Sequence, residues 1–452
     1  MLTNHSVVNA TLMYRKSGFL ILLIALAVAL VFAVYRDIRV ERLRYGSDLR
    51  NRVVGARLIK DGHSPYFYKW DKKDGMRYYD PDNDDPDKCE LGKLSVITAT
   101  PFFHHLLYPV AELPQLQIYR IWLILEYLLW IGLALSFFWL ARTPVQKSAV
   151  LIVATSFLFT EAWYMHILYG QYYILVPFLA ALFYLFIKNH KTPLMAGAAG
   201  LVAIMLILVR PNAFLLFLPF LFLWKTYTRS YLILLFIPIV LLTAWTVLDK
   251  NEYGLWQDYK NAVAQHTAAH LHLQPYIHSA TPPSFSDWEG VDFEKMSQPV
   301  ILHGENENGN FFLLFRKIYK PGLGLLPLQA LSLCLILTVT GAFFLRHRRT
   351  GEYALPQVAM LGYCLYMISD LFSPISRWQY YTVQWLFPLL LAAAVYDRRD
   401  KWPFTLLLIG LGLNVINIPR FGIEHSLGEY LMLAALIRLS FSPKPLKQAL
   451  PA

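Results

Sequence analysis

Apolar runs separated by polar connectors follow one another along almost the whole chain. A helix needs about 20 mostly apolar residues to cross the roughly 30 Å hydrocarbon core of a bilayer, and most of the runs approach that length. They lie at residues 18–35, 117–140, 148–160, 172–187, 194–209, 213–224, 231–248, 322–345, 354–372, 380–396, 403–416 and 425–440. The pattern predicts an all-α polytopic membrane protein with about 12 transmembrane helices and two long polar segments, at about 36–116 and 249–321.

Two of these runs need a further decision. The run 213–224 is short, which favours a broken or re-entrant segment, and such backbone is tolerated at membrane depth only where it faces protein or a watery cavity. The first run follows Arg15 and Lys16, a basic start that also fits a signal peptide. The many later runs favour a retained helix.

Composition supports a membrane protein. Hydrophobic residues make up 56% of the 452 residues and charged residues 16%, against about 45–50% and about 25% in soluble domains. This balance excludes a disordered chain and argues against an ordinary water-soluble enzyme.

The basic residues gather in the short connectors. The chain has 41 basic and 30 acidic residues, a formal charge of +11. The basic connectors are Arg15 to Lys16, Arg142 to Lys147, Lys188 to Lys191, Lys225 to Arg229, Arg346 to Arg349, Asp397 to Lys401 and Arg438 to Lys447. Because basic short loops mark the cytoplasmic side of a plasma membrane, both termini are predicted inside and both long polar segments outside. The excess charge therefore suits anionic lipid headgroups and requires no nucleic-acid partner.

This orientation divides the chain into three parts. They are a cytoplasmic N-terminus at 1–17, one membrane domain at 18–440 and a cytoplasmic tail at 441–452.

The first outer segment contains a predicted amphipathic helix. Leu49, Val53 and Ala56 recur at helical spacing, which is typical of a helix that lies in the membrane interface. Asp48 stands at its start and Arg52 follows one turn later. Two interpretations stay open: Asp48 caps the helix and Arg52 is its exposed partner, or both belong to a site.

The short outer turns each carry one arginine, Arg210, Arg377 or Arg420. An arginine at the end of an apolar helix either extends its guanidinium to water or meets an anion. Several arginines that converge would form a phosphate site, because guanidinium groups bind phosphate oxygens through paired donors.

Metal sites receive little support. In the acidic loop 80–87, Asp85 stands where a calcium loop needs its sixth-position glycine, so a solvated loop is the favoured interpretation. His266, His270 and His272 have metal-like spacing, but neither a carboxylate nor a cysteine completes a site nearby in the sequence.

Several segments together resemble glycosyltransferase family 87, the polyprenyl-phosphate-mannose-dependent α-mannosyltransferases of the GT-C fold. The similar segments are Ser47-Asp48, Gly62 to Tyr66, the apolar stretch Thr100 to Pro114, Gly170-Gln171, Ala196 to Gly200, Arg210-Pro211 and the turn Ser373 to Ser376. Their order and spacing match across roughly 40–400. The chain departs from the family after the last turn, because Arg377-Trp378-Gln379-Tyr380 stands where the family often has tryptophan and then histidines. No family histidine is carried over there.

The resemblance implies inverting transfer of a hexose, mannose in the family, from a polyprenyl-phosphate donor on the outer face. The acceptor hydroxyl needs a base, for which Asp48 is the candidate, and the departing phosphate needs cations. The candidate phosphate ligands are Arg210, Arg377, Arg52 and Arg420, and the candidate sugar or acceptor ligands are Gln171, His104, Tyr66, Gln379 and Tyr380. Because arginines neutralise a single phosphate, neither a metal nor a cofactor is expected. The expected partners are the lipid-linked sugar, a glycolipid or glycan acceptor, and membrane lipids.

Two other functions are open to the same sequence. A flippase or transporter of lipid-linked saccharides explains many spans and a basic cavity, but leaves the two long outer segments without a role. An O-antigen ligase or polymerase acts on the same face with a lipid-pyrophosphate donor.

Overall fold

The computed structural model describes residues 3–40, 46–66, 68, 74, 77–78, 99–189, 192–271, 310–311, 325–348, 353–373, 377–395, 401–414 and 424–442. Every regular element in these ranges is a helix, and the chain is a helical membrane protein. By length and composition, four of these helices can each cross a membrane: α1 (Thr3–Val40), α4 (Gln115–Leu140), α10 (Arg229–Leu248) and α14 (Leu325–Arg348). The bent pair α5 (Pro144–Phe157) and α6 (Glu161–Tyr169) forms a fifth if its members are counted together, with a 55° bend.

The other apolar runs also fold as helical segments, which are shorter. They are α7 (Leu175–Lys188), α8 (Pro193–Val209), α9 (Phe214–Phe217), α15 (Leu355–Leu371), α16 (Leu386–Val395), α17 (Lys401–Leu413) and α18 (Glu424–Ser440). Helical segments therefore coincide with all of the predicted apolar runs, while the number of complete membrane crossings stays a prediction.

The chain breaks at Arg210, before the short run 213–224, and the run itself stays helical from Pro211 to Thr226. Arg210 has extended backbone, with φ −145° and ψ 95°, and Pro211 follows it without an N–H to continue the helix. The chain then passes through the 3-10 helix η3 (Pro211–Ala213), α9, and the 3-10 helix η4 (Leu218–Thr226). The break places Arg210 at the C-terminal end of α8, an apolar helix.

Close helix contacts in the bundle depend on glycines. A Cβ on Gly362 of α15 would lie 2.2 Å from the Leu216 carbonyl oxygen of α9, and one on Gly200 of α8 would lie 1.9 Å from the Leu235 oxygen of α10. Small residues let helix backbones approach in this way, because apolar burial gives little attraction between helices in lipid. The almost fully buried α15 and the fully buried α16 form the centre of this packing.

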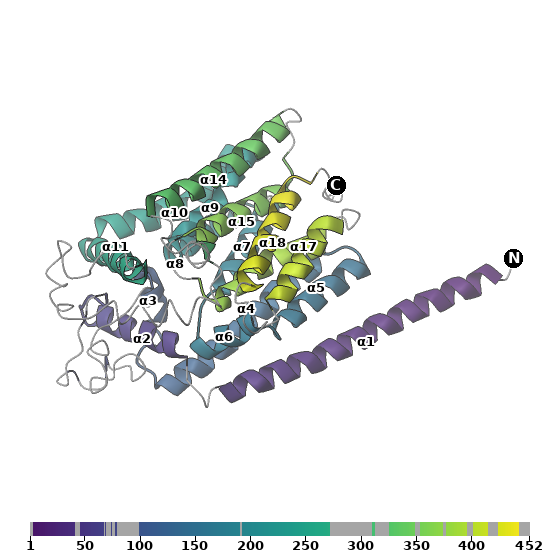
Figure 1. Ribbon diagram of the computed structural model, residues 1–452, viewed down its shortest axis with the longest axis horizontal. Coiled ribbons are helices and arrows are strands. Elements are labelled where there is room, and N and C mark those ends of the chain that lie inside the picture. Colours follow the sequence, from purple (N-terminus) through teal and green to yellow (C-terminus); the bar gives the residue numbers. More distant parts are fainter. Residues whose placement is uncertain are drawn as a thin grey trace.

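Helix α1 is fastened to the bundle near its C-terminal end. Asp37, fully buried, accepts hydrogen bonds from Tyr127 Oη at 2.7 Å and Trp163 Nε1 at 2.9 Å, and pairs with Arg36 at 2.7 Å. Toward its N-terminus α1 diverges from the other helices (Figure 1).

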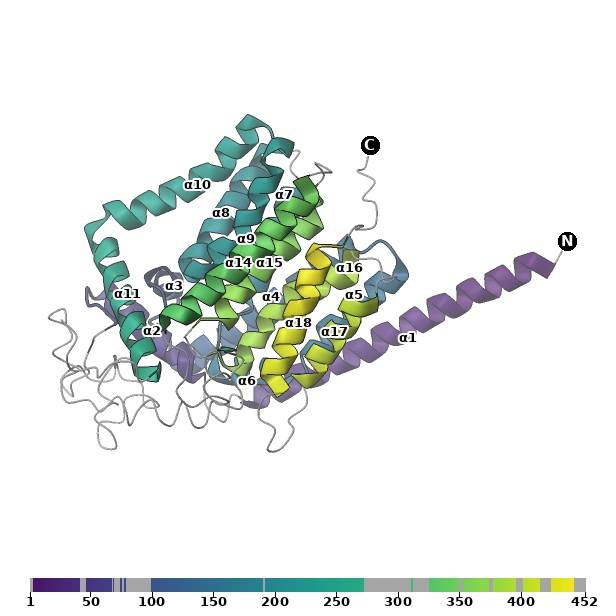
Figure 2. The same cartoon turned by 45° about the horizontal axis from the view of Figure 1, so that its top comes forward.

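Three helices outside the main bundle lie together at one end of it, called the polar end below. They are α2 (Ser47–Lys60), α3 (Pro101–Leu107) and α11 (Lys250–Leu271). Figure 2 shows them at that end, whereas the start of α1 and the end of α18 lie toward the opposite end. The helix predicted from Leu49, Val53 and Ala56 is confirmed as α2, and these side chains are at most 1% exposed.

A cluster of charged side chains joins α2 to the turn before α4. Arg77 donates to Asp61 at 2.6 Å and to Glu112 at 2.7 Å, and Lys60 pairs with Glu112 at 3.0 Å. These hydrogen bonds lower the pKa of both Asp61 and Glu112 to about 2. The carboxylates are partly exposed, so each pair stabilises the fold by less than about 1 kcal/mol.

The variant Arg77→Gln is expected to unfold at a lower temperature than the wild type at pH 7. Since the folded-state pKa of the two carboxyls lies below the unfolded value of about 4, the ion pairs stabilise fully above pH 4 and progressively less as the pH falls toward 2. The difference in Tm between wild type and variant should therefore shrink over this interval. The matched variant Arg39→Gln should show no such pH dependence, because Arg39 contacts Tyr35. A gap for Arg77→Gln that stays constant from pH 7 to pH 2 would contradict the assignment.

Candidate active site

Asp48 and Arg52 lie one turn apart on α2 and share Gln171, from the turn after α6, as a partner. Gln171 donates from Nε2 to Asp48 Oδ2, and Arg52 donates from Nη2 to Gln171 Oε1 at 2.7 Å. Arg52 also donates from Nη1 to the Gly170 carbonyl at 3.1 Å, and its Nη2 lies 3.7 Å from Asp48 Oδ2. The Asp48 side chain is 38% exposed and that of Arg52 is 11% exposed. The carboxylate is thus oriented by a fixed donor and remains open to solvent.

The interpretation of Asp48 as a helix cap is wrong. Gly46 caps α2, with φ 66°, and Asp48 stands in the first turn. Arg52 is not an exposed partner either, because its guanidinium reaches across to Gly170 and Gln171. A carboxylate in the first turn of a helix still benefits from the N-terminal backbone dipoles.

Two glycines let α2 approach the turn after α6. Gly46 and Gly170 both have positive φ, 66° and 62°, which glycine adopts without steric cost. A Cβ on Gly170 would lie 2.7 Å from Leu49 Cβ and 3.2 Å from Gly46 Cα. This backbone contact brings the side chain of Gln171, the next residue, within reach of Asp48.

The backbone of Gln171 is fixed by hydrogen bonds to neighbouring helices. Its N–H donates to the His166 carbonyl at 2.9 Å, and its carbonyl accepts from Trp122 Nε1 at 3.0 Å. His166 in turn lies 2.7 Å from Glu126 Oε2 of α4, and both of these side chains are buried. The amide that holds Asp48 therefore belongs to a rigid part of the bundle.

His104 and Tyr66 pack beside the same helix. His104 Nδ1 lies 2.9 Å from the Arg52 carbonyl, which only accepts, so this nitrogen carries the proton. Burial lowers the pKa of His104 to about 3, which keeps the ring neutral. Tyr66 lies 6.2 Å from His104 between ring centroids and donates its hydroxyl to the Ala99 carbonyl at 2.9 Å.

Arg210 points into the bundle instead of out to lipid headgroups. It donates from Nη2 to Asp370 Oδ1 of α15, and its guanidinium carbon lies 5.1 Å and 5.2 Å from the ring centres of Tyr173 and Tyr381. Within the described part of the chain, its buried Nε meets no acceptor. Arg210 is therefore a buried cation with an unused donor.

Arg377 is held differently, although it shares Asp370 with Arg210. Its side chain is almost fully buried and donates from Nε and Nη2 to the two oxygens of Glu429 of α18, at 2.7 Å and 3.1 Å. Its Nη1 donates to Asp370 Oδ2. Each nitrogen already has a protein acceptor, so Arg377 holds Asp370 and Glu429 in place. Neither this arginine nor Arg210 extends to water, which excludes the alternative that both merely snorkel.

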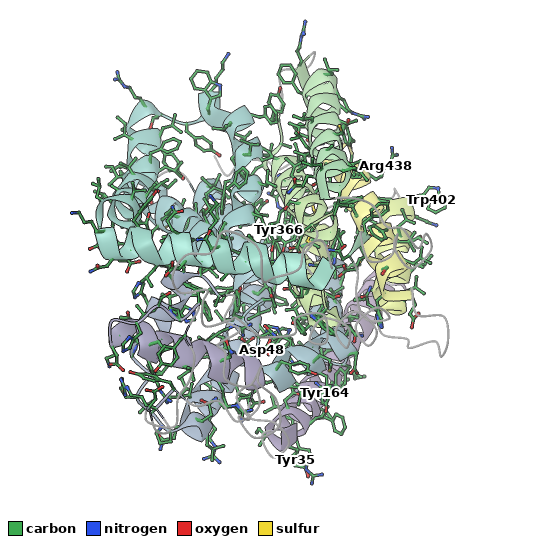
Figure 3. All side chains as sticks on the ribbon, turned by 60° about the vertical axis from the view of Figure 1, so that its left-hand side comes forward. Tyr35, Asp48, Tyr164, Tyr366, Trp402 and Arg438 are labelled. Atoms are coloured by element: carbon green, nitrogen blue, oxygen red, sulfur yellow. The ribbon has the colours of Figure 1, made fainter. Side chains whose placement is uncertain are left out.

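Four tyrosines, called the tyrosine cluster below, lie between the Asp48 group and the Arg210 group. They are Tyr172, Tyr173, Tyr380 and Tyr381. The ring centroid of Tyr173 lies 4.9 Å from that of Tyr172, 5.7 Å from that of Tyr380 and 4.1 Å from that of Tyr381. Arg52 lies 4.8 Å from the Tyr172 ring and Arg210 contacts the Tyr173 ring. In Figure 3 helix α11 crosses in front of the space between Asp48 and Tyr366. The ring of Tyr366 also lies near the Arg210 guanidinium. Residues far apart in sequence thus face one set of aromatic rings.

The remaining candidates lie in different surroundings. Gln379 is buried, and its amide lies 3.3 Å from His425 Nε2 of α18. Tyr380 belongs to the tyrosine cluster. Arg420, His272 and the acidic loop 80–87 lie outside the described residues, as do the side chains of His266 and His270.

Sequence reasoning missed Asp370 and Glu429, which neutralise the buried arginines. Both are carboxylates within predicted apolar runs, and that position alone marks an ionisable residue as a candidate for a site. Among the described residues, no three His, Cys, Asp or Glu side chains gather closely enough to hold a metal ion.

Comparison with family models, curated proteins and solved structures finds no match to this chain.

The variant Gly170→Ala is expected to destabilise the protein by about 1–3 kcal/mol. An alanine there must adopt a left-handed backbone conformation at a cost of about 1–2 kcal/mol, and its methyl group would press α2 away from Gln171. The matched variant Gly197→Ala, in the middle of α8 with open space around a Cβ, should leave stability unchanged or raise it by up to about 1 kcal/mol. Thermal unfolding in detergent measures both variants. Equal stability of Gly170→Ala and wild type would refute the close contact.

Proposed function

We propose that the protein is an inverting glycosyltransferase that moves a hexose, mannose in the first instance, from a polyprenyl-phosphate donor to a lipid-linked or cell-envelope glycan acceptor. In this proposal the chain has a GT-C-type fold of about 12 transmembrane helices. Both termini are cytoplasmic, and the polar end faces outward from the plasma membrane.

One observation carries the proposal. A half-exposed carboxylate, Asp48, lies beside Arg52, which contacts the Tyr172 ring, and a buried cation with an unused donor, Arg210, contacts the neighbouring Tyr173 ring. A transferase that uses a lipid-phosphate donor needs a base and a leaving-group cation on opposite sides of the sugar carbon, and two such groups at different rings of one cluster support this assignment. The sugar ring would then lie against the tyrosine cluster.

The reaction is a single displacement. The acceptor oxygen forms a bond to the anomeric carbon, the bond from that carbon to the phosphate oxygen breaks, and the acceptor proton passes to Asp48. General bases of this kind contribute about 10²–10⁴-fold to the rate. Attack from the face opposite to the leaving group inverts the anomeric configuration.

The leaving lipid phosphate gains negative charge as the bond breaks. Arg210 is the best placed described cation to stabilise this charge, since a fixed cation in a water-poor site acts strongly on the transition state. Arg52 orients Gln171 and lies on the Asp48 side, and Arg377 acts indirectly by holding Asp370. The lipid-linked sugar is the co-substrate, and the proposed reaction uses no further cofactor.

Other activities use less of this geometry. A flippase needs cations that bind the lipid phosphate, but it catalyses no reaction in which an oriented carboxylate such as Asp48 would accept a proton. A ligase or polymerase must neutralise the larger charge of a pyrophosphate donor and so needs a further cation. Arg377 does not provide it, because this arginine already donates to two carboxylates.

The variant Asp48→Asn is expected to lower the turnover of sugar transfer about 10²–10⁴-fold, because asparagine cannot accept the proton. Binding of the donor should persist, since an amide oxygen can still accept the hydrogen bond from Gln171. Proteoliposomes with polyprenyl-phosphate mannose and candidate acceptors provide the assay.

The matched control is Asp61→Asn, which removes a carboxylate at the opposite end of α2 that pairs with Arg77. This variant should keep full transfer activity. Wild-type turnover by Asp48→Asn would rule out Asp48 as the base.

A further inference from the structure

Helix α11 brings one more tyrosine to the site, from the second polar segment. The ring of Tyr259 lies 5.7 Å from that of Tyr66 and 5.6 Å from that of Trp256. Its phenol is close enough to Tyr172, Tyr381 and Arg210 for each of them to affect its ionisation. Tyr259 therefore lies against Tyr66 at the edge of the site, within electrostatic range of Arg210.

The position of α11 is fixed at its first turns. Asp249 Oδ1 accepts hydrogen bonds from the backbone N–H groups of Asn251 at 2.9 Å and Glu252 at 3.1 Å, which turns the chain from α10 into α11. Glu252 then pairs with His105 of α3 at 2.6 Å. This pair joins the two polar segments and holds Tyr259 beside Tyr66, two turns further along α11.

Tyr259 and Arg210 share one property: each has a hydrogen-bond donor that the protein does not use. No residue of the described chain forms a hydrogen bond with the hydroxyl of Tyr259, whose side chain is partly buried. The Arg210 Nε is buried without an acceptor. An unsatisfied buried donor such as the Arg210 Nε is unfavourable unless a ligand supplies the missing acceptor. This cationic donor and the unpaired Tyr259 hydroxyl together fit a ligand with several anionic oxygens.

We propose that the Tyr259 hydroxyl and the Arg210 guanidinium together bind the phosphate of the lipid-linked donor, so that both polar segments contribute to one phosphate site. This inference rests on the proposed function, since it assigns a further ligand to the same donor. Tyr259 is a binding residue in this arrangement and transfers no proton.

The state of the phenol agrees with a donor role. Burial, together with the neighbouring Tyr172 and Tyr381 phenols, raises the pKa of Tyr259 despite the opposing effect of Arg210. The hydroxyl therefore keeps its proton at neutral pH and can donate it in a hydrogen bond to a phosphate oxygen.

The test compares binding of farnesyl phosphate and farnesol to the full-length protein in detergent micelles. The two probes share their chain and differ in the phosphate alone. The variant Tyr259→Phe keeps the ring packing and removes the hydroxyl, and it should bind farnesyl phosphate about 10-fold more weakly than the wild type. Its affinity for farnesol should stay unchanged. The matched control Tyr253→Phe removes a hydroxyl from an exposed tyrosine on the same helix and should alter neither affinity.

The outcomes separate this inference from the proposed function. If the wild type prefers farnesyl phosphate and Tyr259→Phe retains the full preference, the Tyr259 assignment is wrong and the proposed function stands. Equal weakening toward both probes would assign Tyr259 to packing and would also overturn the inference. A wild type without any preference for farnesyl phosphate would contradict the proposed function and this inference together.

Discussion

The neutralisation of Arg377 is the interaction on which the rest of the site depends. A guanidinium buried among apolar helices is strongly unfavourable unless carboxylates pair with it in good geometry. Glu429 of α18 and Asp370 of α15 supply those carboxylates, and Thr382 and Trp385 also donate to Glu429, at 2.9 Å and 3.2 Å. Because Arg377 occupies one oxygen of Asp370, the other is left to orient Arg210. Two arginines and two carboxylates thus form one charge-balanced group.

The carboxylate on the other side of the tyrosine cluster has the opposite environment. Asp48 is partly exposed, and it is held through Gln171 on a helix that glycines allow to approach closely. Exposure suits a base that a glycan acceptor must reach, whereas burial strengthens the effect of Arg210 on a charged leaving group. The two groups come from distant parts of the chain, and the tyrosine cluster is where they meet.

The sequence predicted those features that depend on local periodicity. Leu49, Val53 and Ala56 predicted α2, and the apolar runs predicted where the other helical segments lie. The interpretation of Asp48 as the cap of α2, one of the two left open, is wrong, and the sequence could not reveal the true cap because a glycine with positive φ leaves no signal in periodicity. The shared role of Asp370 could not be predicted either, because it depends on how the ends of α8 and α15 meet in space. For Glu429, its position in an apolar run was a usable signal.

The most direct measurement of the central claim is a structure of the protein bound to polyprenyl-phosphate mannose in a lipid nanodisc, without an acceptor. The phosphate is expected to lie within hydrogen-bond distance, about 3 Å, of Arg210. The sugar should lie against the tyrosine cluster, with its anomeric carbon turned toward Asp48. A lipid phosphate bound elsewhere, with Arg210 still paired with Asp370 alone and Asp48 remote from the sugar, would contradict it.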